Sequence, residues 1–157
     1  MATKVIKAME DIPGLSEAEV QGFLNSSKIP LHLATTNEDG SPVIHPIWYL
    51  YENGKLYLYT GRDALKARNI KRTKNAYFSV DTSTDPPKEV KGKASASFLS
   101  DVLDSVRIAQ AIILKYTSAD NPYIQSATKE IQSGESVVIE LTPQYYSTWD
   151  YEKLGQS

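Results

Sequence analysis

Short strand patterns separated by tight-turn sequences run through most of the chain, and they constrain its fold more than any other feature. Six runs are rich in β-branched, aromatic and other apolar residues and are bounded by turn formers: residues 29–36, 41–51, 55–60, 75–81, 89–99 and 136–151. The turns NEDG and ENGK join the first three runs into a predicted antiparallel meander. Because many short strands would leave unpaired edges in an open sheet, we expect a small β-barrel.

Three segments have helical rather than strand patterning. The first, LSEAEVQGFLNSS, carries Ser16 and Glu19 at the spacing of a capping box. The second follows Asp101 and places apolar residues at helical spacing: Val102, Val106, Ala109, Ile113 and Tyr116. The third begins at Pro122, a residue that is favoured at the first position of a helix. The sequence therefore predicts a mainly β fold with flanking helices.

The composition is that of one soluble domain, which we expect to span residues 1–157 with a helical insertion at about 101–132. The absence of cysteine excludes disulfides, thiolate nucleophiles and Cys-ligated metal clusters. No stretch approaches the roughly 20 apolar residues of a membrane span, and the N-terminal sequence lacks the apolar core of a signal peptide. We therefore expect a cytoplasmic protein with no membrane partner.

Positive charge is concentrated in the segment TGRDALKARNIKR and the two residues after it. Residues 60–74 carry six Lys or Arg and one Asp, a net +5, so the rest of the chain carries −7 to give the total of −2. This acidic remainder argues against nucleic acid as a partner.

The same segment also has the donors of a phosphate site. If a helix begins near Asp63 or Ala64, Lys66 and Asn69 share one face close to its positive end, just after Thr60 at a strand terminus. An ammonium, an amide, a hydroxyl and free backbone N–H groups are what a phosphate requires. A solvated helix face without any ligand is the alternative explanation of the same charges.

Side-chain catalysis has little support in the sequence. His32 and His45 lie on different predicted strands, and neither has a carboxylate or a second histidine at metal-ligand spacing. We expect both to be structural and we expect no metal site. No serine lies in a Gly-rich nucleophile elbow, and no pair of carboxylates stands out, so the catalytic residues are unknown. If the protein is an enzyme, a cofactor supplies the reactive atoms.

Three motifs follow one another over residues 31 to 97: ATxxxDGxPxxxPxWY, YTxxxxxKxRNI and VKGKASA. In this order and spacing the chain resembles the flavin-binding split β-barrel proteins related to pyridoxamine phosphate oxidase. The resemblance implies a Greek-key-like split β-barrel, a homodimer, and FMN bound non-covalently at the dimer interface.

The resemblance also implies roles for particular residues. Thr60, Lys66 and Asn69 would hold the FMN phosphate, with Tyr59 beside them. The run His45, Pro46, Ile47 and Trp48 would lie under the isoalloxazine ring and offer backbone groups to its polar edge. The best candidate to reach the flavin of a partner subunit is Trp149.

The likeness does not extend to the vitamin B6 oxidase itself, because STWDYEKLGQS lacks that enzyme's Arg-rich substrate motif. The chain looks more like the divergent branch of flavin or deazaflavin oxidoreductases. The function that this implies is an FMN-dependent oxidoreductase, which passes hydride or electrons between a nicotinamide or deazaflavin donor and a small organic substrate. The alternatives are a deazaflavin-dependent reductase and a non-catalytic protein that binds flavin or haem.

Overall fold

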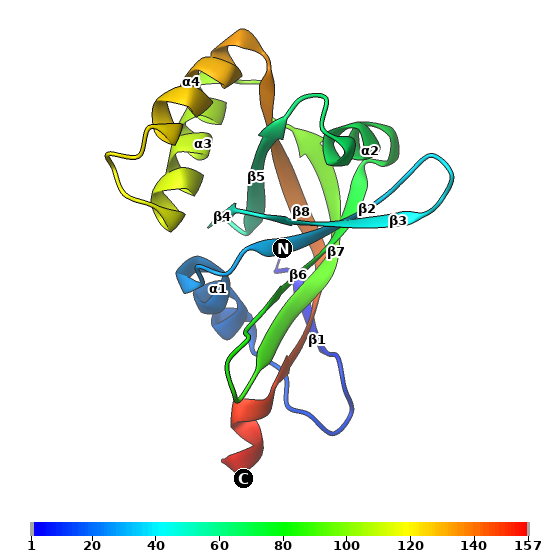
Figure 1. The fold of residues 1–157 in the computed structure, drawn as a ribbon. Helices are drawn as coiled ribbons and strands as arrows, with labels where there is room; N and C mark the ends of the chain where they lie inside the picture. The colour runs from blue at the N-terminus through cyan, green and yellow to red at the C-terminus, as the bar shows by residue number, and fades with distance from the viewer. Residues whose placement is uncertain (1, 157) are drawn as a thin grey trace.

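The structure, a computed structural model, describes residues 2–156 (Figure 1). Its strands are β1 Lys4–Lys7, β2 Leu31–Thr36, β3 Pro42–Ile47, β4 Tyr49–Glu52, β5 Lys55–Gly61, β6 Asn75–Asp81, β7 Lys88–Phe98 and β8 Ser136–Asp150. Its helices are α1 Glu17–Ser26, α2 Leu65–Thr73, α3 Val102–Tyr116 and α4 Tyr123–Ser133, and the short 3₁₀ helix η1 spans Tyr151–Gly155. The predicted mainly β architecture with flanking helices is confirmed. Strand β1 and helix η1 were not predicted.

All strands belong to one curled sheet of order β3-β2-β6-β7-β8-β5-β4, and β1 adds to β8 in parallel. The other pairs are antiparallel. Strands β3 and β4 lie at the two ends of this order, yet only Trp48 separates them in the chain. The sheet therefore curls until its two ends meet, which is the geometry of a split barrel and confirms the predicted fold class.

The predicted meander is wrong at Trp48. Residues 41–51 do not form one strand, because β3 pairs with β2 while β4 pairs with β5. A strand that continued straight through Trp48 would leave the two ends of the sheet apart. The bend at this residue carries the chain from one end to the other, and the curled sheet depends on it.

The long strands β7 and β8 form the centre of the sheet, and a register shift after Lys93 bends their ladder. Just before this shift, Gly92 packs directly against the neighbouring strand. A Cβ atom at Gly92 would lie 2.2 Å from the carbonyl oxygen of Tyr145. Only glycine permits this approach of two backbones.

The core has two parts. The barrel interior is filled by side chains of the strands together with α1 and α2, and its fully buried members include Val20, Leu24, Leu33, Tyr49, Leu58, Ile70 and Ile139. The second part lies between β5, β8 and the paired helices α3 and α4, which pack side by side at one end of the molecule (Figure 1). Ser16 and Glu19 form the predicted capping box of α1.

The buried face of α3 differs from the predicted one. The face that packs consists of Ser105, Ile108, Ala109, Ile112 and Ile113, while Val102 is exposed. Only part of the predicted stripe was right, because Ala109 and Ile113 are buried whereas Val102, the first residue of the helix, lies outside the packed face. Among residues 2–156, no helix combines the length and the apolar character needed to cross a bilayer.

Candidate functional site

Helix α2 is attached to the end of β5 by a short turn. The amide of Arg62 donates to the carbonyl of Glu135, and that of Ala64 donates to Gly61. The helix then begins at Leu65 without a side-chain cap, close to the predicted start. This placement leaves the first N–H groups of α2 without capping side chains, beside the last residues of β5.

Lys66 and Thr60 meet at this junction, as predicted. The Nζ of Lys66 lies 3.5 Å from the Oγ1 of Thr60, whose side chain is buried. Among the ion pairs of residues 2–156, none includes Lys66. Burial lowers the pKa of its ammonium below the usual value. A half-buried ammonium with a hydroxyl as its neighbour and no carboxylate is a favourable position for an anionic group.

Asn69 lies on the same side of α2 but is already hydrogen-bonded within the protein. Its side chain is almost fully buried, and its amide donates to Thr35 Oγ1 at 3.1 Å and Asn37 Oδ1 at 2.9 Å. The side-chain oxygen of Asn69 accepts a hydrogen bond from the guanidinium of Arg72, which also donates to the backbone carbonyl of Thr36. In this structure Asn69 therefore holds α2 against the end of β2.

Sequence reasoning missed Thr35, Asn37 and Arg72. The position of Arg72 three residues after Asn69 was a usable signal, since residues i and i+3 are neighbours on a helix. The other two residues are next to a turn far away in sequence, and only the pairing of β2 and β6 brings them beneath α2. Thr35, Asn37 and Arg72 form a polar cluster with Asn69 on the side of α2 that faces β2.

The His45 side chain lies on the inner face of β3. His45 pairs with the buried Leu33, and its Nδ1 is buried without a hydrogen-bond partner in the described part of the chain. Burial is the main cause that lowers the pKa of His45, and the positive charge of Lys66 is the second. The two side chains are therefore electrostatic neighbours, and His45 is neutral near pH 7. Its unsatisfied nitrogen is a buried polar atom available to a ligand.

Strand β3 offers its backbone as well. Its recorded ladder is with β2 alone, and it forms one end of the sheet. In an edge strand, alternate N–H and C=O groups point away from the single neighbour and remain available. Pro46 lacks an N–H, so the donors of the predicted run can come only from its other members.

Trp48 follows directly, at the bend between β3 and β4. Its indole stacks on the ring of Tyr116, with centroids 5.0 Å apart and planes 5° apart. The Trp48 side chain is 39% exposed, so part of the indole remains open to a ligand. Trp48 therefore extends the run of His45, Pro46 and Ile47 to the bend, and His45 is the member of this run that senses the charge of Lys66.

Two predicted site residues, Tyr59 and Trp149, do not face the junction of Thr60 and Lys66. The hydroxyl of Tyr59 donates to the carboxylate of Glu130 in α4, and its pKa is raised to about 12, mainly by burial. Its side chain thus packs against the helices, while its neighbour Thr60 faces Lys66. Trp149 is stacked edge to face with Tyr151 at the far end of β8. Thr60 pairs with Val137 of β8, so about 40 Å of strand separates Trp149 from the phosphate candidates.

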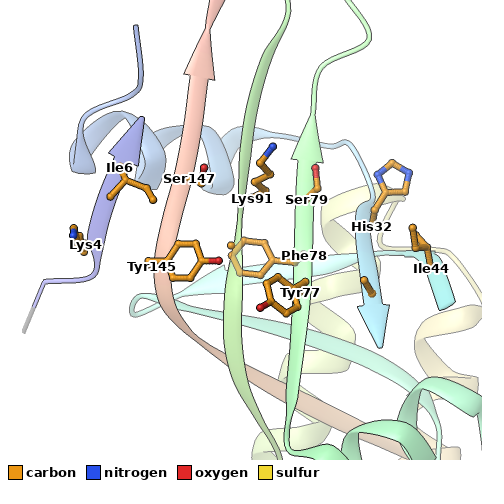
Figure 2. A pocket seen from close by; sticks show the side chains of 12 residues that line it. Lys4, Ile6, His32, Ile44, Tyr77, Phe78, Ser79, Lys91, Tyr145 and Ser147 are labelled. Carbon is orange, nitrogen blue, oxygen red and sulfur yellow. The ribbon is translucent and has the colours of Figure 1, made fainter. Parts of the chain in front are cut away.

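An open groove of 610 Å³ lies on the outer face of the sheet, across β1, β8, β7, β6, β2 and β3 (Figure 2). Tyr77 and Tyr145 lie near its centre, and Ile6 and Ile44 flank it on opposite sides. Lysines and a histidine stand around this apolar floor: Lys4, Lys91 and His32. Tyr77 is 50% and Ile44 65% exposed, so apolar side chains form part of the open surface of this groove.

His32 lies at the rim of this groove, and its Nδ1 is 3.5 Å from the carboxylate of Asp81. Within residues 2–156, no group of three or more His, Cys, Asp or Glu side chains is arranged to hold a metal ion.

Comparisons with solved structures support the same fold. A conserved hypothetical protein, Rv2991 from Mycobacterium tuberculosis, is 26% identical, with a TM-score of 0.80 over 96% of this chain and 93% of that one. A putative 5-nitroimidazole antibiotic resistance protein from Bacteroides thetaiotaomicron is 15% identical, with a TM-score of 0.70 over 88% and 86% of the two chains. An F420 reductase is 19% identical, with a TM-score of 0.65 over 87% and 98%.

No curated protein matches the chain significantly. A family model does match, and it covers residues 16–150, which include α1, the whole barrel edge with the Lys66 junction, and both helices of the insertion. The match therefore includes every element that builds the candidate site. On this evidence the chain belongs to the pyridoxamine 5'-phosphate oxidase family.

Proposed function

We propose that the protein is an oxidoreductase that binds FMN non-covalently, with the phosphate at the junction of β5 and α2 and the ring along β3. The observation that carries this proposal is the half-buried ammonium of Lys66, which has Thr60 beside it and no recorded carboxylate partner. An unpaired charge in this environment costs stability in the free protein, and a phosphate dianion offsets that cost.

The residues present also fit the ring of a flavin. A flavin has a planar apolar face and a polar edge of alternating donors and acceptors. The open backbone edge of β3 and the unsatisfied nitrogen of His45 supply polar groups, while the exposed part of Trp48 supplies an apolar surface. When bound, the flavin supplies the redox chemistry, by taking up and releasing a hydride or electrons.

The chain's own residues bind and orient the cofactor. Lys66 and Thr60 hold its phosphate, and the backbone of β3 fixes the direction of the ring. Asn69 contributes indirectly. Its hydrogen bonds to Thr35 and Asn37 hold α2, the helix that carries Lys66, in place against β2. His45 is neutral near pH 7 and can therefore accept or donate a hydrogen bond without adding a second positive charge beside Lys66.

The proposal includes a homodimer formed through the outer face of the sheet. The groove centred on Tyr77 is apolar, and charges of both signs stand beside it, with Lys91 next to Glu89 and His32 next to Asp81. A surface that carries both signs can pair with its own copy about a two-fold axis. A dimer would also allow Trp149 to contact the cofactor of the other subunit, since Trp149 lies at the opposite end of β8 from Val137, the strand partner of Thr60.

The dimer has its own test. Ile44→Glu places a charge on the apolar groove and should convert the protein to a folded monomer in sedimentation experiments. Leu103→Glu is the matched control, because Leu103 is 80% exposed on α3, away from the groove. Equal sedimentation of the two variants as dimers would exclude this face as the interface.

A deazaflavin cofactor is the second candidate. The similarity to an F420 reductase favours it, and the same Lys66 junction would hold a deazaflavin phosphate. The first experiment is the absorbance spectrum of the purified protein, followed by titration with FMN and with F420, and by addition of NADPH, NADH or reduced F420.

Reduction of bound FMN by one of these donors, with turnover, supports the proposed enzyme. Binding of F420 but not FMN would replace the cofactor in the proposal. A bound flavin that no donor reduces would favour a non-catalytic binder, and a Soret band would indicate haem instead.

A further inference from the structure

The helical insertion contacts the candidate cofactor site through the last turn of α3. Its final residue, Tyr116, stacks face to face on Trp48, with ring centroids 5.0 Å apart and planes 5° apart. Trp48 belongs to the edge along which we propose that the flavin ring lies. A residue of α3, which is outside the sheet, is thus in van der Waals contact with the wall of the site.

Tyr116 is itself held firmly. Its hydroxyl donates to the carbonyl of Ile29 at 3.2 Å, and its ring packs edge to face on the buried ring of Tyr49. The preceding residue, Lys115, has its Nζ 3.5 Å from the centroid of the Tyr49 ring and donates to the carbonyl of Leu24 near the end of α1. The last turn of α3 is therefore fixed to α1, to β4 and to the segment before β2.

Trp48 has no comparable support from the sheet. It is the one residue between β3 and β4, at the bend where the ladder passes from one end of the sheet to the other. No strand pair of the described residues includes it. Stacking on the ring of Tyr116 is therefore the contact that can fix the orientation of the Trp48 indole.

We infer that Tyr116 is a positioning residue for the cofactor ring, which acts by fixing the indole of Trp48 at the barrel bend. This inference rests on the proposed function, and it gives the helical insertion a role at the site rather than only a role in packing. It predicts that the identity of residue 116 affects the part of the affinity that belongs to the ring and leaves the part that belongs to the phosphate unchanged.

The first half of the test needs no ligand. The chain has two tryptophans, so Trp149→Phe leaves Trp48 as the only one. In that background, Tyr116→Met should raise the rate of acrylamide quenching of Trp48 and lower its fluorescence anisotropy, because the stack is lost. Tyr116→Phe keeps the ring and should change both readouts much less.

The second half measures affinity for FMN and for riboflavin, which lacks the phosphate, in chains that retain Trp149. Tyr116→Met should weaken both ligands equally, by roughly three- to tenfold, which is the range expected for one lost aromatic contact. Lys66→Ala should weaken FMN alone. Tyr116→Phe should stay within about twofold of the unmodified protein.

Two further variants separate positioning from a loss of stability. Ile108→Val thins the packing of the same helix against α4 without touching Trp48, and it should leave both affinities unchanged. Tyr116→His retains a smaller planar ring and should give an intermediate loss, so it serves if Tyr116→Met does not fold. Riboflavin affinity that falls as much in Ile108→Val as in the Tyr116 variants would overturn the inference.

The remaining outcomes distinguish this inference from the proposed function. Flavin binding that Tyr116→Met and Tyr116→His leave intact would overturn the inference alone, as would quenching of Trp48 that neither variant alters. Failure of the unmodified protein to bind any flavin or deazaflavin would overturn the proposed function and, with it, the role of Tyr116.

Discussion

Removal of the Lys66 ammonium is the most direct test of the phosphate site. Charge-assisted hydrogen bonds contribute about 1.5–3 kcal/mol when they are partly desolvated, and Lys66 is half buried beside Thr60. At about 1.4 kcal/mol per factor of ten, Lys66→Ala should weaken FMN binding by roughly ten- to a hundredfold. Riboflavin should bind the variant and the unmodified protein equally, because it has no phosphate.

Arg68 provides the matched control. It lies on the same helix two residues away, is exposed, and so turns to a different side of α2. An exposed charge contributes about 0–1 kcal/mol, so Arg68→Ala should change FMN affinity by less than about fivefold. Fluorescence titration of both variants with both flavins gives all the affinities that are needed.

The stability of the free protein provides a second, opposite readout. Because the Lys66 ammonium is partly buried without a carboxylate partner, Lys66→Met should leave the free energy of unfolding unchanged or raise it. A folded, equally stable variant with weakened FMN binding would locate the effect at the ligand. Equal FMN affinities for Lys66→Ala and the unmodified protein would refute the reasoning and show that the basic segment is only a solvated helix face.

Three further predictions concern stability, each measurable by urea denaturation. Gly92→Ala should lower the free energy of unfolding by about 3 kcal/mol, because its Cβ would overlap a carbonyl oxygen 2.2 Å away, whereas Gly22→Ala in α1, where the Cβ meets nothing, should be neutral or slightly stabilising. Asn69→Ala removes the hydrogen bonds that hold α2 on β2 and should cost roughly 2 kcal/mol; no loss would mean that the helix is held by its apolar contacts alone. Burial lowers the pKa of Lys115 from 10.5 to about 8, so the unfolded chain binds more protons between these values and stability should rise from pH 8 to 10.5, by about 1 kcal/mol for a half-buried group. In Lys115→Met that rise should be absent, and an unchanged pH profile would contradict the assignment.

The sequence was most informative where local chemistry determines structure. The turn residues of NEDG and ENGK, the capping box at Ser16 and the start of a helix after Asp101 all occur as predicted, because each depends on residues within a few positions of one another. The junction of Thr60 and Lys66 was predictable for the same reason, since a strand end and the following helix are joined by a short turn.

The rest of the site depends on contacts between distant segments. Thr35 and Asn37 are 34 and 32 residues from Asn69 and come under it only through the order of the strands. The contact between Trp48 and Tyr116 joins residues that have strands β4 to β7 and helix α2 between them in the sequence. The bend at Trp48 was missed because residues 41–51 keep strand character throughout, and no Gly marks the break.

The burial of Tyr59 against α4 illustrates a second limit. A strand presents alternate side chains to opposite faces, so Tyr59 and Thr60 cannot both face α2. The sequence showed this alternation but did not show that α4 would cover the other face with Glu130 as a partner.

The candidate site contains two polar groups that the described residues leave incompletely paired, which lowers the stability of the fold. Lys66 is half buried without a carboxylate, and His45 has a buried nitrogen without a hydrogen-bond partner among the described residues. Among the described residues, no other buried side-chain nitrogen or oxygen lacks a hydrogen-bond partner. Both deficits occur at the same edge of the barrel, and the positive charge of one lowers the pKa of the other. A folded protein can retain unsatisfied polar groups at a binding site, because the bound ligand satisfies them and recovers the free energy that they cost the unliganded fold. Bound FMN, if it satisfies these two groups as proposed, should therefore stabilise the fold, by an amount that rises with the logarithm of the ratio of FMN concentration to its dissociation constant.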